Sequence, residues 1–131
     1  MTKVRGIRGA IRVADNSRES IHAATRELLQ AIIANNRLDP DDIASIFLTT
    51  TPDLNADFPA YAVRALGWTY VPLLGAQEVA VPGAMTRVVR VLLHVNSDRP
   101  PDQIRHCYLG ETKSFRPDLA EGDNHDSGDE N

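Results

Sequence analysis

The chain has 131 residues, 42% of them hydrophobic and 24% charged, and a formal net charge of −4 at pH 7. This composition is typical of one globular domain and excludes a typical nucleic-acid-binding protein, since no basic cluster is interleaved with aromatic residues. No stretch is long enough to span a membrane, and the N-terminus has no apolar signal core. We therefore expect a cytoplasmic protein with no nucleic-acid or membrane partner. Cys107 is the single cysteine, which fits a reducing compartment.

A strand and a long helix are expected first. Residues 4–10 alternate as in a strand, and small side chains on the same face leave room around Arg8, as suits the floor of a pocket. Asp15, Asn16 and Ser17 follow as candidate helix caps, and Asn16 with Glu19 resembles a capping box. Apolar residues three and four positions apart then predict an amphipathic helix to about Asn35.

The middle of the chain predicts a second strand and a short helix. A turn at 39–42, which begins with a capping residue and a proline, leads into a strand at 43–50. After a loop, residues 58–66 are expected to form a short helix, because Pro59 suits the first helical turn and Gly67 suits the stop.

Three further strands are expected at 70–78, 87–96 and 103–109, and a last extended piece runs through Arg116. Helix is the alternative for 87–96, since its apolar residues also fit the helical period. We choose strand because β-branched residues cluster there and turn-forming residues bound the segment on both sides.

These elements predict an α+β fold with a single domain at residues 1–119. Its mixed five-stranded sheet would carry one long and one short helix on one face. The opposite face would be left uncovered, and its exposed apolar area is better explained by oligomer formation than by contact with water. Residues 120–131 are polar and acidic with no core residue, so we expect a disordered tail there.

Arg90 is the most informative single residue. It lies in the apolar run at 88–93, with no acidic residue within seven positions on either side. Such a run is expected in the protein interior, where an unpaired guanidinium is costly and cannot lose its proton. An anionic or strongly hydrogen-bond-accepting group should therefore contact the guanidinium of Arg90, either a distant carboxylate of this chain or a ligand. Arg8 and Arg116 repeat the pattern, which indicates a pocket for a small acidic molecule.

Other kinds of chemistry lack the residues that they need. His106 and Cys107 are adjacent, so in a strand they would point to opposite faces and could not form a nucleophile pair. The histidines lack metal-ligand spacing, and there is no phosphate loop, nucleophile elbow or redox cysteine pair. We therefore expect neither a metal nor a cofactor. The remaining polar candidates are the arginines, Glu78 and Tyr108.

Each candidate also has an ordinary structural interpretation. Arg90 could be the partner of Glu78 in a structural ion pair, and the residues alone leave this interpretation and the functional one open. Glu78 at a strand end could be a surface residue, and Tyr108 could be a half-buried aromatic. Arg116 could make an exposed C-terminal contact, and Phe58 could be a hydrophobic anchor for the short helix.

Six segments stand in an order that is more specific than any one of them. They are Arg5–Ala10; Thr51–Leu54 with Phe58–Ala60 and Ala62–Arg64; Gln77–Glu78; Arg90–Val91; Asp102–His106 with Tyr108–Leu109; and Arg116–Leu119. In this order the chain resembles the small trimeric chorismate mutases, the class with a mixed-sheet pseudo-α/β barrel rather than the all-helical class. The resemblance covers nearly everything from Val4 to Leu119.

The resemblance implies a homotrimer with its pockets between neighbouring subunits, which would account for the uncovered sheet face. It implies a cofactor-free isomerase of aromatic amino-acid biosynthesis that converts chorismate to prephenate by an intramolecular Claisen rearrangement. The substrate is a dicarboxylate with an ether oxygen and a ring hydroxyl, and no proton, electron or covalent intermediate need pass to the protein. Catalysis would come from holding a compact conformer and stabilising charge as the ether bond breaks.

The resemblance also implies roles for single residues. Arg90 would lie beside the ether oxygen, Arg8 would hold a carboxylate, and Glu78 would accept a hydrogen bond from the ring hydroxyl. Tyr108 would add a polar contact. The other site residues would line the ring (Leu74, Gly75, Ala76 and Gln77), form an apolar wall (Phe58 and Ala60), or close the mouth of the pocket (Arg64, Phe115 and Arg116).

Two departures from the family pattern concern affinity more than reaction type. Gly75 stands where some relatives have a side chain facing the substrate, and Tyr61 takes a position that is basic in some relatives.

Two other functions are alternatives to the mutase. A Rid-type imine deaminase also holds a carboxylate with a strand arginine, but it does not explain Glu78, Tyr108 and Arg116 together. A non-catalytic module that binds an aromatic metabolite would need the arginines for binding alone.

Overall fold

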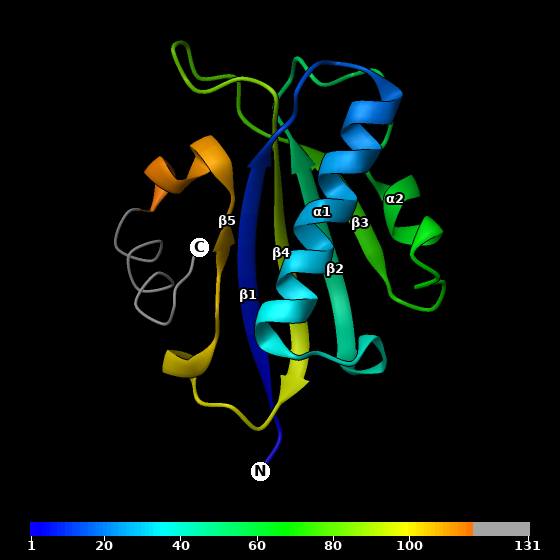
Figure 1. The fold of residues 1–131 in the computed structure, drawn as a ribbon, viewed down its shortest axis with the longest axis vertical. Helices are drawn as coiled ribbons and strands as arrows, with labels where there is room; N and C mark the ends of the chain where they lie inside the picture. Colours follow the sequence, from blue (N-terminus) through cyan, green and yellow to red (C-terminus); the bar gives the residue numbers. More distant parts are fainter. Residues whose placement is uncertain (117–131) are drawn as a thin grey trace.

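The computed structural model describes residues 1–116 and shows a five-stranded sheet with α1 and α2 on one face (Figure 1). The strands are β1 (Lys3–Arg12), β2 (Ile43–Thr50), β3 (Leu73–Gln77), β4 (Val88–Ser97) and β5 (Cys107–Tyr108). The helices are α1 (Arg18–Asn36) and α2 (Ala60–Ala65), with short 3₁₀ helices η1 (Pro40–Asp42), η2 (Pro101–Gln103) and η3 (Gly110–Phe115). The predicted α+β fold with a mixed five-stranded sheet is confirmed. The predicted tail at 120–131 and the predicted domain end at 119 lie outside the described residues.

The sheet is mixed and has the strand order β3-β2-β4-β1-β5. β4 is antiparallel to both of its neighbours, whereas β3 runs parallel to β2 and β5 runs parallel to β1. The register places Arg90 between Ala10 of β1 and Thr49 of β2. Arg90 therefore lies in the middle of the sheet, among residues that come from distant parts of the sequence.

The main core lies between the sheet and α1. The predicted apolar stripe of α1 is buried, with Ile21, Leu28 and Ile32 fully so, and it packs against the residues of β1, β2 and β4 that face it. Figure 1 shows α1 crossing this face of the sheet, with α2 beside it. In β4 the alternate residues Val89 and Val91 enter the same core. The prediction of a strand rather than a helix at this place is confirmed.

The N-terminal end of α1 agrees with the prediction in part. Ser17, one of the expected caps, accepts a hydrogen bond from the Ser20 backbone N–H, but the predicted capping box of Asn16 and Glu19 is wrong. The other end is close to the prediction, because Arg37 takes a left-handed conformation (φ 51°) and stops the helix. Within residues 1–116, no helix is both long enough and apolar enough to cross a membrane.

The predicted strand at 103–109 is wrong over most of its length, since only Cys107–Tyr108 pairs with β1. A turn and a side-chain contact keep the preceding residues out of the sheet. The prolines before Asp102 start a 3₁₀ turn, and the Asn36 side chain binds both the N–H and the carbonyl of Arg105. A backbone whose polar groups are already bonded to a side chain does not continue a ladder.

Two other segments that were predicted to be extended also differ from the prediction. The last piece, predicted to be extended through Arg116, is η3, and Gly110 begins it with a positive φ of 56° that glycine adopts without strain. β3 begins at Leu73 instead of residue 70, because Val71 donates its N–H to Trp68 in a turn.

The second face of the sheet is covered by neither α1 nor α2, as expected. Val4, Phe47 and Leu74 are 59%, 39% and 62% exposed in the chain, and by strand alternation they share this face. Phe47 and Leu74 are paired across β2 and β3, and exposed apolar side chains side by side on a sheet face are unusual for a surface in contact with water.

Gly9 marks a close approach of β1 to α1 and gives a stability prediction. A methyl group on Gly9 would lie 2.8 Å from the Cys107 backbone oxygen and 3.0 Å from a Leu28 methyl group. We expect Gly9→Ala to lower the free energy of unfolding by about 1–3 kcal/mol, because a backbone carbonyl cannot move aside cheaply. Gly75→Ala is the control, since its methyl group would have its nearest neighbour at 3.7 Å. Denaturant midpoints at one protein concentration measure both, and equal midpoints would contradict the prediction.

Candidate active site

A cavity on the uncovered face of the sheet, here called the arginine pocket, collects four of the predicted site residues. It has a volume of about 370 Å³ and is lined by Arg8, Gly9, Phe47, Thr49, Glu78, Arg90, Val91, Leu92 and Tyr108. Arg8 lies on β1, Arg90 on β4 and Tyr108 on β5, and Glu78 directly follows β3. The strand order thus brings together residues from both ends of the chain.

Arg90 and Glu78 face each other in this pocket. Nη1 of Arg90 lies 3.5 Å from Oε2 of Glu78, and the same oxygen accepts a hydrogen bond from the Thr49 hydroxyl. The Arg90 and Glu78 side chains are 48% and 28% exposed. An ion pair with this exposure contributes at most about 1 kcal/mol to stability. The structural ion pair considered from the sequence is present, but it is too weak to account for an arginine at this position.

The expectation that Arg90 lies in the protein interior is wrong for this chain. Its neighbours Val89 and Val91 are buried, while half of the Arg90 side chain is exposed on the other face. Successive residues of a strand point to opposite faces, so an apolar run can carry an exposed arginine without a large desolvation cost. The guanidinium is therefore accessible from the arginine pocket.

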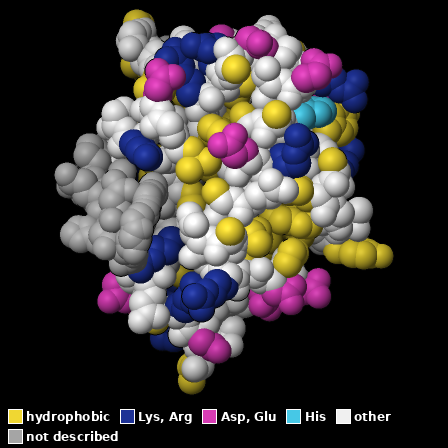
Figure 2. All heavy atoms as spheres, in the orientation of Figure 1, with side chains coloured by type: hydrophobic (Ala, Val, Ile, Leu, Met, Phe, Trp, Pro, Cys, Tyr) yellow, Lys and Arg dark blue, Asp and Glu magenta, His cyan; other side chains and the backbone are white. Residues whose placement is uncertain are grey.

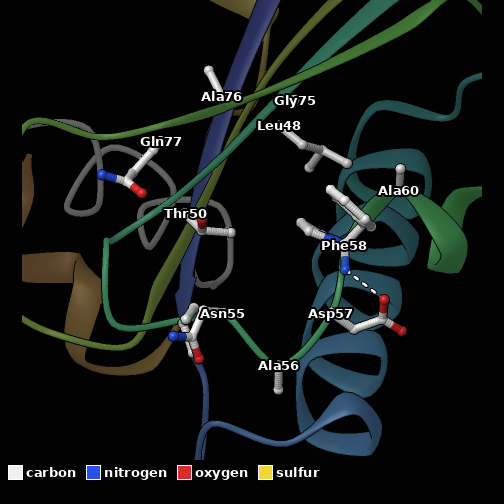
Figure 3. A pocket seen from close by; sticks show the side chains of 12 residues that line it. Leu48, Thr50, Asn55, Ala56, Asp57, Phe58, Ala60, Gly75, Ala76 and Gln77 are labelled. Carbon is white, nitrogen blue, oxygen red and sulfur yellow. Dashed lines mark hydrogen bonds between the residues drawn. The ribbon is translucent and has the colours of Figure 1, made fainter.

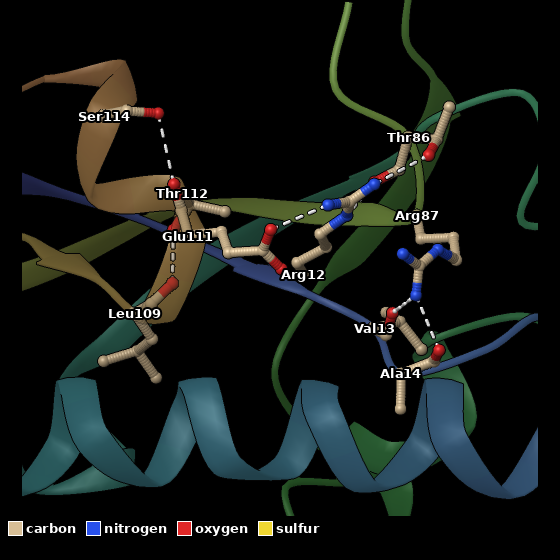
Figure 4. A network of polar contacts seen from close by, with 9 residues as sticks. All are labelled: Arg12, Val13, Ala14, Thr86, Arg87, Leu109, Glu111, Thr112 and Ser114. Carbon is tan, nitrogen blue, oxygen red and sulfur yellow. Dashed lines mark hydrogen bonds and ion pairs between the residues drawn. The ribbon is translucent and has the colours of Figure 1, made fainter.

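Arg8 differs from the arginines that hold the far end of β1. Arg12 binds the Glu111 carboxylate at 2.8 Å together with the backbone and hydroxyl oxygens of Thr86, and Arg87 donates to two backbone oxygens just after β1 (Figure 4). These contacts fix the segment before β4 and the start of η3. None of the ion pairs within residues 1–116 includes Arg8, whose side chain lines the arginine pocket instead.

Tyr108 forms one wall of the arginine pocket. It is more buried than the half-buried aromatic considered from the sequence, at 2% exposed, and it packs with Ala10, Val88 and Met85. Tyr108 therefore lines the arginine pocket from a closely packed position.

His106 adds a contact that the sequence did not indicate. Its Nδ1 accepts a hydrogen bond of 3.0 Å from the backbone N–H of Arg8. Burial, followed by the charges of Arg8 and Arg116, lowers the pKa of the His106 imidazole to about 4. The ring is therefore neutral at pH 7, as an acceptor nitrogen requires.

A second cavity, the loop pocket, collects five other predicted residues. It has a volume of about 590 Å³ and is lined by Leu48, Thr50, Leu54, Asn55, Ala56, Asp57, Phe58, Pro59, Ala60, Gly75, Ala76 and Gln77 (Figure 3). Figure 3 shows Leu48, Phe58 and Ala60 on one side and Thr50 and Gln77 on the other. The lining is mostly apolar, which suits one wall of a site for a carbon ring.

The loop that carries Phe58 is anchored to the start of α1. Asn16 accepts hydrogen bonds from two backbone N–H groups of this loop, at 3.1 Å each. The Asp57 carboxylate lies 3.3 Å from Arg18 Nε and 3.0 Å from His22 Nε2. These contacts hold the loop on the side of the sheet where α1 lies.

The two pockets lie on either side of the end of β3. Gln77 lines the loop pocket, and the next residue, Glu78, lines the arginine pocket. One chain therefore does not bring all the predicted residues into one cavity. The predicted residues outside both pockets are Arg64, Leu74, Phe115 and Arg116. Within residues 1–116, no three His, Cys, Asp or Glu side chains are grouped so that they could hold a metal ion.

The chain matches one protein family over most of its length. The sequence model of the family described as chorismate mutase type I matches residues 4–119. This chain belongs to that family. Chorismate mutase AroH of Thermus thermophilus is 50% identical over 117 residues, which are 88% of this chain and 96% of the relative. Chorismate mutase AroH of Bacillus subtilis is 47% identical over 118 residues, which are 89% of this chain and 93% of the relative.

A solved chorismate mutase has the same fold. The enzyme from Clostridium thermocellum superposes with a TM-score of 0.82 at 44% sequence identity, covering 84% of this chain and 98% of the other. The resemblance inferred from the six ordered segments is thus confirmed for the family and for the fold.

Some residues that hold the candidate site in place carry no clear signal in the sequence. Thr49 binds Glu78 across 29 positions of sequence, and His106 binds Arg8 across 98. Asn16 did carry a signal, as a polar residue before a helix, but its side chain binds the loop before α2 instead of capping α1. Contacts of this kind depend on the pairing of distant strands.

Proposed function

We propose that this type I chorismate mutase converts chorismate to prephenate by a Claisen rearrangement, with each active site shared by two subunits of a homotrimer. The arginine pocket is the observation that supports this function most strongly, since Arg8, Arg90, Glu78 and Tyr108 line one cavity. Its volume of about 370 Å³ suits a small ligand. Its two guanidinium groups suit a substrate with two carboxylates and an ether oxygen.

The reaction moves electrons within the substrate alone. The ether C–O bond breaks while a new C–C bond forms, and negative charge grows on the ether oxygen in the transition state. Arg90 presents a planar fork of N–H donors to the pocket and would stabilise this charge. Glu78, 3.5 Å from one nitrogen of the fork, would orient the guanidinium while leaving other donors for the substrate.

The other polar residues of the arginine pocket would position the substrate. Arg8 would bind a carboxylate, and Tyr108 would add a polar contact. Glu78 would accept a hydrogen bond from the ring hydroxyl. One Glu78 oxygen is already bonded to Thr49, which fixes the carboxylate and leaves its second oxygen for the substrate. Holding the substrate in a compact reactive conformer supplies the remainder of the rate enhancement.

The loop pocket would complete the site of a neighbouring subunit. Phe58 and Leu74 are 68% and 62% exposed, and the sheet face around the arginine pocket is uncovered. A trimeric pseudo-α/β barrel would bury both surfaces and join the two pockets. The neighbour would then supply the ring lining (Leu74, Gly75, Ala76 and Gln77) and the apolar wall (Phe58 and Ala60). Arg64, Phe115 and Arg116 would close the mouth.

The relatives also suggest the cellular setting. Those from Thermus thermophilus and Bacillus subtilis are bacterial chorismate mutases. We place this chain with them in aromatic amino-acid biosynthesis in the cytoplasm. A single free cysteine, Cys107, is compatible with a reducing compartment.

Incubation of the purified protein with chorismate tests the activity. We expect the diene absorbance of chorismate to fall and prephenate to accumulate, without added metal or cofactor. Arg26→Ala is a matched control, because Arg26 is an exposed arginine of α1 that lines neither pocket, and its turnover should equal that of the unaltered protein. Binding of chorismate without loss of absorbance would instead identify a module that binds an aromatic metabolite.

A further inference from the structure

His106 lies directly before the point where the backbone pairing between β1 and β5 begins. The two strands pair over only two positions, Gly9 with Cys107 and Ala10 with Tyr108. One position earlier, the backbone N–H of Arg8 points to the same side, and the ring nitrogen Nδ1 of His106 accepts it at 3.0 Å. A side chain thus replaces the backbone acceptor that a longer β5 would have supplied.

This bond links the segments that carry two residues of the arginine pocket, Arg8 and Tyr108. Arg8 carries the N–H that is bound, and Tyr108 lies two residues after the ring that binds it. On one side β1 pairs with β4 over ten positions, including Arg8 with Leu92, so the His106 bond concerns the other side of the strand, where Arg8 faces β5. The edge strand adds little, since it has only two residues.

The ring can accept this bond only while Nδ1 carries no proton. Burial, together with positive charges on Arg8 of β1 and on Arg116 just after η3, lowers the pKa of the imidazole to about 4. Both charged groups that act on the ring are cationic, so both favour the neutral form. The acceptor is therefore maintained at any physiological pH.

We propose that His106 is a positioning residue, whose neutral ring fixes the backbone of Arg8 against Tyr108 and thereby aims the Arg8 guanidinium at a substrate carboxylate. This inference rests on the proposed function, in which Arg8 binds that carboxylate. His106 itself contacts no substrate, and its effect passes through Arg8. A displacement of about 1 Å in a group that holds substrate can cost as much as 10²-fold, here expected in kcat/KM through weaker binding of the carboxylate.

Three substitutions of His106 distinguish the role of its hydrogen-bond acceptor from that of the ring as a whole. His106→Asn keeps an acceptor oxygen bonded to Cγ, where Nδ1 is bonded in histidine, but cannot be protonated. His106→Gln moves the acceptor one atom further out, away from the Arg8 N–H, and His106→Leu removes it at similar volume. We expect KM for chorismate to rise about tenfold in the Leu and Gln variants with kcat within about threefold, and to stay near the original value in the Asn variant.

The same changes in an Arg8→Ala background test whether the effect passes through Arg8. We expect His106→Leu to raise KM in the original protein and to have no further effect once Arg8 is alanine. An equal rise of KM in both backgrounds, or an unchanged KM in the Leu variant, would overturn the inference. Circular dichroism and oligomer size check that each variant is folded, and should the Leu variant fail to fold, the Gln and Asn variants decide.

Two readouts do not depend on a loss of activity. A ¹⁵N titration of the imidazole should show an unprotonated Nδ1 at pH 7, and a protonated Nδ1 there would overturn the inference. The ratio of KM between the original protein and His106→Asn should rise as pH falls toward 4, because only the histidine gains a proton, and the titration of chorismate cancels in the ratio. A flat ratio would also overturn the inference. Absence of turnover by the original protein would refute the proposed function instead.

Discussion

Arg90→Ala is expected to lower kcat for chorismate by roughly 10²–10³-fold, equivalent to about 2.7–4 kcal/mol of barrier, the typical cost of removing one preorganised donor to a developing oxyanion. Arg90→Lys should recover little of this loss, because an ammonium group cannot contact the ether oxygen and Glu78 with the geometry of a planar fork. Loss of diene absorbance under saturating chorismate measures both variants.

The fold itself should tolerate these changes. The Arg90 side chain is half exposed and its ion pair with Glu78 spans 3.5 Å, so Arg90→Ala should change the free energy of unfolding by less than about 1 kcal/mol. A large loss of kcat with unchanged stability would place the effect in the reaction. If Arg90→Ala kept most of the original kcat, the mechanism proposed for the arginine pocket would be wrong.

Two inactive variants are expected to restore activity when they share a trimer. Arg90→Ala removes the fork from the arginine pocket, and Arg64→Glu places a negative charge where the proposed site receives a dianionic substrate. Arg64 is exposed and stacks over Tyr61 at 5.3 Å, so its replacement should leave the chain folded. If each site takes Arg90 from one subunit and Arg64 from its neighbour, co-expression at equal levels leaves about a quarter of the sites intact.

A second mixture distinguishes shared sites from sites within one chain. The variant that carries both changes is co-expressed with the unaltered chain at equal levels. Shared sites predict about a quarter of the original activity, whereas sites within one chain predict about half. No recovery in the first mixture, together with half of the activity in the second, would contradict the shared site. Chromatography of the mixed trimers with two different tags confirms that the subunits have exchanged.

The spacing of apolar residues correctly predicted the helix and the strand that bury one face in the core. The spacing of Ile21, Leu28 and Ile32 predicts α1, and its buried face is the predicted one. In β4, β-branched residues and the flanking turn formers favoured a strand over a helix, and Val89 and Val91 alternate into the core as that prediction requires. These predictions succeeded because a period of two or of 3.6 follows directly from burying one face of an element.

Two predictions failed because polar groups of the segment are bonded to distant parts of the chain. The strand predicted at 103–109 is reduced to β5, because Asn36 of α1 binds the backbone of Arg105. The cap of α1 is Ser17, because Asn16 binds the loop that carries Phe58. Nothing within a short window of sequence reports such partners.

The sequence by itself determined the family, since the order of six segments is enough to identify it, and it determined the α+β class. Tertiary structure decided where the polar residues stand. Arg90 lies on an open face beside Thr49 and near Glu78 rather than in the interior, and the remaining predicted residues divide between two cavities and the surface around them. The physical reason is that periodicity records which side of an element is buried, whereas the meeting of two distant side chains depends on strand order and register, which only the folded sheet establishes.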